Sequence, residues 1–258
     1  MSMKYDVRNE KGLRVEQVID SKSGDVQLTY WVDGNRASKI ALIGNVAERY
    51  AGLTLILKDL DSSLRWIKKS ATISNLPTVD QDKKCFVLPD EVAADAKAFF
   101  VAAVVFYAKA FVESKGRRAQ LSRDSLDGDF RELHDDAMRF RHNMAAHSGE
   151  ERLEAVESFI LLVKGQSGKY DYKLATGGKQ PAFADFGDQG NQSKSFAALI
   201  EHAAEKVHER LEKLGQQLLL AAAAIRTNVI LSLAKKGKPL NLDEAIKRHS
   251  EARNRNQS

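Results

Sequence analysis

The sequence predicts a mainly α protein, a bundle of long amphipathic helices that follows a short N-terminal β-hairpin. Two patterns carry this prediction. From residue 36 onward apolar side chains recur at steps of three and four, the spacing that places them on one face of a helix. The first thirty-odd residues instead alternate and are rich in β-branched and aromatic side chains, as strands are. A length of 258 residues is enough for a sizeable core.

The first elements follow from these patterns. Residues 13–19 and 26–32 are expected to form a hairpin that turns at Ser23 and Gly24. One long helix is then predicted over 36–70. A loop around Pro77 and a short strand at 85–88 come next.

Pro89, Asp90 and Glu91 are typical of a helix start, because proline and acidic residues favour the first turn. This second helix should run to about residue 114, and its apolar middle is expected at the centre of the bundle. A third helix is predicted over 128–147, where Ser148 and Gly149 end it.

The second half of the chain is less regular. The apolar run at 159–163 and the segment 170–174 are separated by two glycines, so a helix that leads into a small hairpin is one interpretation. Residues 176–195 are expected to form a loop, and 196–234 one long helix that ends before Pro239. A short terminal helix should begin at Asn241.

These elements suggest three regions. Residues 1–34 are a hairpin extension, 35–234 are a helical domain with an insert at about 159–195, and 235–258 are a basic tail. That tail has seven basic and three acidic side chains, +4 of the formal net charge of +5. The charge therefore does not by itself predict that the body of the protein binds nucleic acid.

A single cysteine, Cys85, excludes an intrachain disulfide and a cysteine cage for zinc, and we expect it to be a small buried side chain. The N-terminus has no apolar signal region. The longest uncharged apolar run, residues 98–108, is shorter than the about 20 residues that cross a bilayer. We therefore expect a cytoplasmic protein without a membrane segment.

Two charged segments adjoin in the middle of the chain. Residues 109–123 carry five basic and one acidic side chain, and 124–136 carry six acidic and one basic. One interpretation is a solvated loop that leads into a helix with acidic first turns. In the other, Lys115, Arg117 and Arg118 contact the phosphate backbone of RNA.

Several catalytic motifs are absent. The segments 165–169 and 177–179 lack the spacing of a phosphate-binding P-loop. His134 and Asp135 resemble the His-Asp pair of metal phosphohydrolases, but no histidine precedes His134 to complete the ligand set. The sequence therefore predicts no metal site and no cofactor.

The segment from Arg141 to His147, Arg-His-Asn-Met-Ala-Ala-His, lies at the end of the third predicted helix. It resembles the Arg-x(4–6)-His signature of the HEPN superfamily, and the order of helices over 36–234 fits a HEPN-like bundle. The resemblance implies a metal-independent endoribonuclease in which Arg141 and His147 are catalytic. His142 and Asn143 would support them. The alternative is that Arg141 and His142 are surface residues and His147 is a helix C-cap.

Geometry adds a constraint. Arg141 and His147 are six residues apart and would point about 120° away from each other on a straight helix. One helix makes a poor site unless its last turn distorts, whereas two copies across a two-fold axis would pool their side chains. We therefore expect a homodimer. The resemblance also suggests a toxin or antiviral defence effector with a cognate antitoxin or defence partner. The alternative is a non-catalytic module that binds RNA or a nucleotide, or that serves in assembly.

Overall fold

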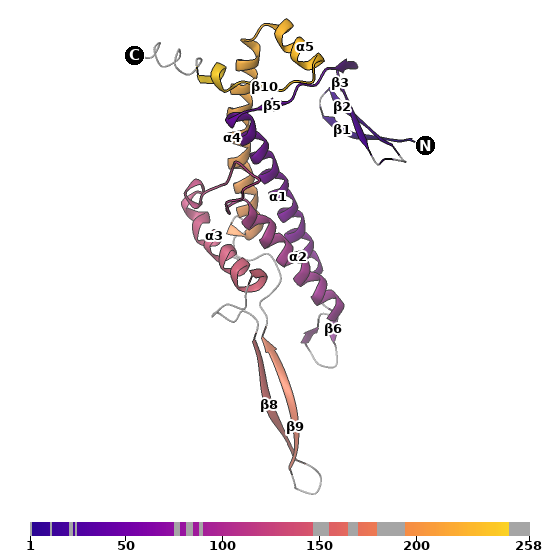
Figure 1. Cartoon of the computed structure of the whole chain (residues 1–258). Coiled ribbons are helices and arrows are strands. Elements are labelled where there is room, and N and C mark those ends of the chain that lie inside the picture. Colours follow the sequence, from indigo (N-terminus) through magenta and orange to yellow (C-terminus); the bar gives the residue numbers. More distant parts are fainter. Residues whose placement is uncertain are drawn as a thin grey trace. The chain divides into compact units, whose positions relative to one another are not determined.

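The protein is mostly helical and carries a small antiparallel sheet at its N-terminus, as predicted (Figure 1). By contacts it divides into two compact units, unit 1 (Met1–Glu48 with Gly215–Ser258) and unit 2 (Arg49–Leu214). Each unit is described by itself. The computed structural model describes residues 2–10, 12–20, 23, 25–74, 78–80, 85–87, 90–146, 155–164, 170–179 and 194–247.

Unit 1 begins with a four-stranded antiparallel sheet in the order β1-β2-β3-β4. The predicted hairpin is confirmed by β2 (Leu13–Asp20) and β3 (Val26–Val32), whose register runs from Leu13 opposite Val32 to Ile19 opposite Val26. Two further strands, β1 (Ser2–Glu10) and β4 (Asn35–Ala37), extend it at its edges.

The first helix starts later than predicted. Residues 35–37 pair with β3 as strand β4, and β5 (Leu42–Ile43) pairs in parallel with β10 (Leu240–Asn241). Helix α1 therefore spans Asn45–Ser74 rather than 36–70. Of the periodic apolar residues before Asn45, Ile43 lies in strand β5 and Ile40 packs against the core of unit 1.

A residue from the far end of the chain fixes the start of α1. The carboxylate of Asp243 accepts hydrogen bonds from the backbone N–H of Asn45 at 2.7 Å and of Val46 at 3.3 Å. Gly44, just before them, has φ of 103°, and a Cβ there would lie 2.6 Å from Oδ2 of Asp243. Only glycine fits this conformation and this approach, so the helix cannot extend backward.

The core of unit 1 joins α4 (Phe196–Ala223), α5 (Thr227–Lys235) and β10. The predicted single helix over 196–234 is wrong, because α4 ends at Ala223 and α5 continues at a bend of 100°. The bend packs the apolar side chains of α5 against a buried cluster, whereas a straight helix would leave these side chains in solvent. That cluster comprises Leu218, Ala221, Leu240 and Leu242, with Ile40, Val46, Ile230 and Leu233 against it.

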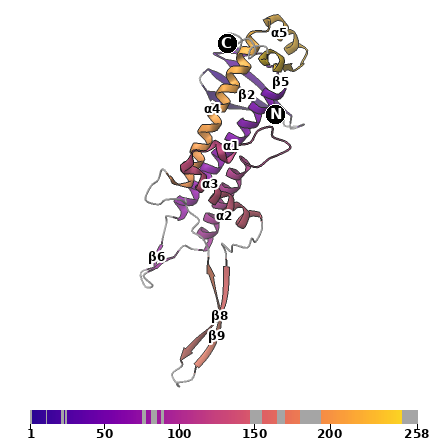
Figure 2. The same cartoon turned by 90° about the vertical axis from the view of Figure 1, so that its left-hand side faces the viewer.

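Unit 2 is built from α1, α2 (Asp90–Lys109), α3 (Gly128–Phe140) and α4, which form its helical bundle (Figures 1 and 2). The hydroxyls of Ser63 and Ser70 donate to the carbonyls of Ala103 and Ala96, so α1 and α2 approach closely. The largest fully buried side chains are Ile56, Leu60, Ile67, Phe100, Tyr107, Leu121, Leu126, Phe196, Leu199, Ile200 and Val207. The apolar middle of α2 is thus in the core, as expected.

Two hairpins complete unit 2. The predicted strand at 85–88 is present as β7 (Cys85–Val87) and pairs with β6 (Thr78–Asp80), although the side chain of Cys85 lies outside the described part. The insert is a hairpin of β8 (Ala155–Lys164) and β9 (Tyr170–Lys179). No helix precedes it within 155–164, which corrects that interpretation.

The β8–β9 hairpin presents an apolar face to solvent. Ile160 lies opposite Leu174, and Leu162 opposite Tyr172, so four large side chains share one face. They are between 60% and 80% exposed. In both views the hairpin extends away from the helices of unit 2 (Figures 1 and 2).

The remaining predicted elements differ in how well their bounds agree with the structure. Helix α2 stops at Lys109 instead of 114, because Ala110 and Phe111 form tight turns back to Tyr107 and Ala108. The terminal helix is present at 243–247, and residues 180–193 of the expected loop lie outside the described part. Among the described helices none alone is long and apolar enough to cross a bilayer. Only α4 and α5 taken together, with their bend, pass that test.

Candidate functional site

The motif segment departs from regular helix. Helix α3 ends at Phe140, and residues Arg141–Ala146 continue it as a π-helix, η2, that contacts α2. The backbone N–H of Arg141 is shared between the carbonyls of Ala137 and Met138. This is the bonding of an ordinary helix end, and the wider π turn follows it over Arg141–Ala146. π-Turns are rare, and many occur at functional sites.

The structure describes part of the predicted site. Arg141 and Asn143 are half-buried and His142 is exposed, all three within the π-helical turn. The catalytic candidate His147 lies outside the described residues, as do the side chains of Met144 to Ala146. The motif residues that are described thus come from one distorted turn.

The three RNA-binding candidates lie in the connection between α2 and α3, and they differ in their exposure to solvent. Arg117 is only 13% exposed: its Nη2 is 2.6 Å from Oδ2 of Asp59, and its Nη1 donates to the carbonyl of Lys109 at 3.0 Å. Its guanidinium therefore ties this connection to α1 and α2. Lys115 and Arg118 are exposed.

The same connection packs closely on α1. A Cβ on Gly52 of α1 would lie 2.9 Å from the Cβ of Ala119 and 3.2 Å from its backbone nitrogen. Leu121 and Leu126 are buried, and the N–H of Leu121 donates to the carbonyl of Ala110. The segment is thus an ordered part of unit 2, which positions the start of α3.

His134 belongs to the core. It is 6% exposed, its Nδ1 is 2.8 Å from the hydroxyl of Tyr107, and the ring of Phe111 lies 4.4 Å away between centroids. Burial lowers the pKa of His134, and burial together with the charge of Asp135 raises the pKa of Tyr107. Both groups are therefore neutral at pH 7 and share a hydrogen bond.

Asp135 faces a different partner. Its two carboxylate oxygens accept hydrogen bonds from Nε and Nη2 of Arg123 at 2.8 and 2.7 Å, and this hydrogen bonding lowers the pKa of Asp135. His134 and Asp135 thus have separate partners, the first in the core and the second on Arg123. Over the described residues no group of three or more histidine, cysteine and acidic side chains could hold a metal ion.

A second buried histidine was not singled out by its sequence context. Nε2 of His202 accepts the backbone N–H of Asp127 at 3.2 Å, and its ring stacks on Phe130 at 4.5 Å between centroids. The carboxylate of Asp127 also lies 3.3 Å from Nζ of Lys206. Through these contacts α4 holds the first turn of α3. Because Nε2 accepts, a neutral ring carries its proton on Nδ1.

Comparison of the chain with family models, with curated proteins and with solved structures finds no match. The functional argument therefore depends on the residues of this chain and on their geometry.

Proposed function

We propose that the protein is a metal-independent endoribonuclease with a HEPN-like bundle, active as a homodimer. The observation that carries the proposal is the π-helical turn at Arg141–Ala146. On a straight helix Arg141 and His147 point apart, so a single helix needs a distorted last turn to form a site. The π-helical turn is such a distortion, and it begins at Arg141. Regular helix up to Phe140 and packing against α2 give this turn a fixed support.

The chemistry needs few groups, because RNA carries its own nucleophile. The 2′-hydroxyl attacks the adjacent phosphorus, and the bond from phosphorus to the 5′-oxygen breaks. An imidazole takes the proton of the 2′-hydroxyl or returns one to the 5′-oxygen, a contribution of about 10²–10⁴-fold, and we assign this to His147. The products are a 2′,3′-cyclic phosphate and a 5′-hydroxyl.

Arg141 has the charge-stabilising role. Negative charge accumulates on the non-bridging phosphate oxygens during attack, and a guanidinium presents a planar pair of donors to them. His142 and Asn143, from the same turn, are placed to orient the phosphate or the imidazole. Two copies of the turn across a two-fold axis would supply two arginines and two histidines to one cleft.

The test is RNA cleavage by the purified protein with EDTA present, alongside its mass in solution. Wild type should cleave as a dimer, and Arg141→Ala and His147→Ala should remain dimers and lose cleavage by at least about 10²-fold. Arg65→Ala and His208→Ala, at exposed helix positions, are matched controls that should cleave normally. Normal cleavage by His147→Ala would overturn the catalytic assignment, and cleavage that EDTA abolishes would favour a metal site.

A toxin or defence effector should act in cells. Expression of wild type should arrest growth, whereas His147→Ala at equal protein level should not. Co-expression with a cognate antitoxin or defence partner should restore growth. Equal growth with both forms would contradict the toxin role and leave the cleavage assay as the measure of activity.

A second function is favoured by a different observation. A cavity in unit 1 gathers an arginine and a lysine beside a tyrosine, as a module that binds RNA or a nucleotide without cleaving it would require. A wild-type protein that binds RNA and leaves it intact would support this function over the endoribonuclease.

A further inference from the structure

The cavity of unit 1 has a volume of about 410 Å³, within the range of small-ligand sites. Strand β3 contributes Leu28, Thr29 and Tyr30, and β4 with the residues after it contributes Arg36, Ala37, Ser38 and Lys39, with Ala234 of α5 completing the wall. The antiparallel pairing of Tyr30 with Ala37 brings the two segments together.

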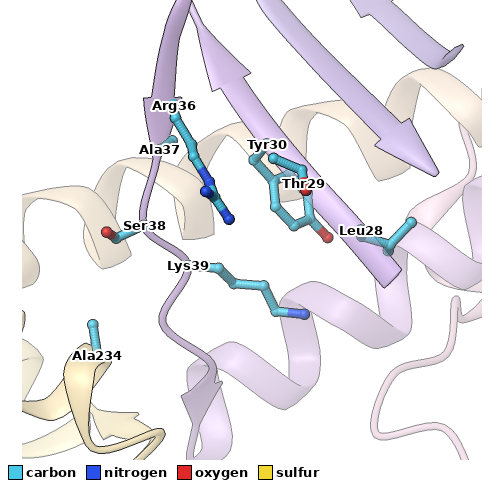
Figure 3. Close-up of a pocket in the computed structure, with 8 residues that line it drawn as sticks. All are labelled: Leu28, Thr29, Tyr30, Arg36, Ala37, Ser38, Lys39 and Ala234. Atoms are coloured by element: carbon cyan, nitrogen blue, oxygen red, sulfur yellow. The ribbon is translucent and has the colours of Figure 1, made fainter. Parts of the chain in front are cut away.

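Cationic groups converge in this cavity. Figure 3 shows the side chains of Arg36 and Lys39 extending toward Tyr30. The ammonium of Lys39 lies 5.7 Å from the centre of the Tyr30 ring. None of the eight lining residues is acidic, so two positive charges share one concave surface without a carboxylate among its walls. Such a surface attracts anions.

The other walls have complementary chemistry. Thr29 brings a hydroxyl that donates hydrogen bonds, and the phenol of Tyr30 adds another. Leu28, Ala37 and Ala234 supply apolar surface, and an aromatic ring offers a face on which a base can stack. The site therefore pairs donors for an anion with room for a flat group.

We infer that this cavity binds the phosphate of a nucleotide, with Arg36 and Lys39 on the phosphate oxygens and Tyr30 against the sugar or base. An arginine fork matches two phosphate oxygens, and the lysine adds a point charge. The phosphate belongs either to a free mononucleotide or to an RNA chain. This inference deepens the second function proposed above and does not rest on the endoribonuclease, since every lining residue lies in unit 1 and the motif lies in unit 2.

The experiment is a calorimetric titration of the intact wild-type protein with adenosine monophosphate, with inorganic phosphate and with adenosine. A short single-stranded RNA is titrated into the His147→Ala protein, which should not cleave it. The monophosphate should bind, adenosine should bind at least about ten-fold more weakly, and added salt should weaken the binding. RNA that binds tighter than the monophosphate assigns the phosphate to RNA, whereas RNA that binds more weakly assigns it to a free nucleotide.

Variants test the assignment to the cavity. Arg36→Gln and Lys39→Gln should each weaken monophosphate binding by about ten-fold, since each removes a charge-assisted hydrogen bond. Arg226→Gln and Lys238→Gln remove exposed cations of unit 1 outside the cavity and should bind as wild type does. Unchanged circular dichroism and melting temperature show that each variant is folded.

The inference is overturned if wild type binds neither adenosine monophosphate nor inorganic phosphate and the His147→Ala protein binds no RNA. It is also overturned if the folded double variant of Arg36 and Lys39 binds the monophosphate as wild type does. Failure of the endoribonuclease proposal gives a different result from failure of this inference. In that case His147→Ala and wild type would treat RNA alike while monophosphate binding still depended on Arg36 and Lys39.

Discussion

Unit 2 holds its histidines and arginines in two different settings. His134 and His202 are buried, and each has a defined hydrogen-bond partner, Tyr107 for the first and the backbone of Asp127 for the second. Arg141 and His142 instead lie in a π-helical turn where neither side chain is buried. The contrast teaches that a high density of histidines in a sequence is no guide to chemistry, because burial separates histidines of the core from those that solvent reaches.

The largest expected effect is at the buried pair. Tyr107→Ala should lower the free energy of unfolding by about 3–5 kcal/mol, as loss of a fully buried aromatic ring does. Tyr107→Phe should cost about 1–3 kcal/mol, because His134 loses its partner. Arg141→Ala should change stability by less than about 0.5 kcal/mol. Urea denaturation measures all three, and a larger loss at Arg141 than at Tyr107 would break the comparison.

The second test separates Arg117 from its neighbour Lys115. Arg117→Ala leaves the mostly buried carboxylate of Asp59 without its closest cation, so unfolding should become easier by about 1–3 kcal/mol. Lys115→Ala, at an exposed position, should stay within about 0.5 kcal/mol of wild type. Equal stabilities of the two variants would show that the contact with Asp59 does not stabilise the fold and would leave Arg117 an RNA-binding candidate like Lys115.

A third test uses pH. Because the folded state lowers the pKa of His134, the unfolded chain takes up a proton below about pH 6.5 while the folded core does not. The unfolded state then binds more protons, so the free energy of unfolding falls as the pH drops below that value. As the pH is lowered from 8 to 5, the denaturation midpoint should fall less steeply for His134→Gln than for wild type, and equal slopes would contradict this assignment.

The smallest effect is expected where side chains contact neither the core nor the motif. Leu174 is 80% exposed on the β8–β9 hairpin, so Leu174→Ser should change the unfolding of the helices by less than about 0.5 kcal/mol. Leu133→Ser on the core face of α3 is the matched buried control and should be strongly destabilising. A thermal melt followed at the helical signal distinguishes them.

Much of the fold could be predicted from local patterns, and the errors occur where distant residues decide. The β2–β3 hairpin and the starts of α2 and α3 follow from periodicity and from turn residues. The start of α1 does not, because its cap is Asp243, far along the chain. The break between α4 and α5 lies in an alanine-rich stretch that favours helix, and packing of Ile230 and Leu233 overrides this preference.

The candidate site shows the same division. A short motif was enough to single out Arg141, His142 and Asn143, but nothing local indicates that their turn is π-helical. The run at 159–163 is equally compatible with helix and strand, because a short apolar stretch lacks a decisive period. The pairing of Tyr107 with His134 and the gathering of Arg36 and Lys39 depend on tertiary packing and on strand pairing.

The bond between Asp243 and the start of α1 also has a consequence for synthesis. The strand that pairs with β5 and the carboxylate that caps α1 are translated about two hundred residues after β5 and Asn45. At a rate of about 5–20 residues per second, the interval is on the order of 10–40 seconds. Unit 2, which ends at Leu214, is translated within that time, whereas β5 and the start of α1 must wait for residues 240–243.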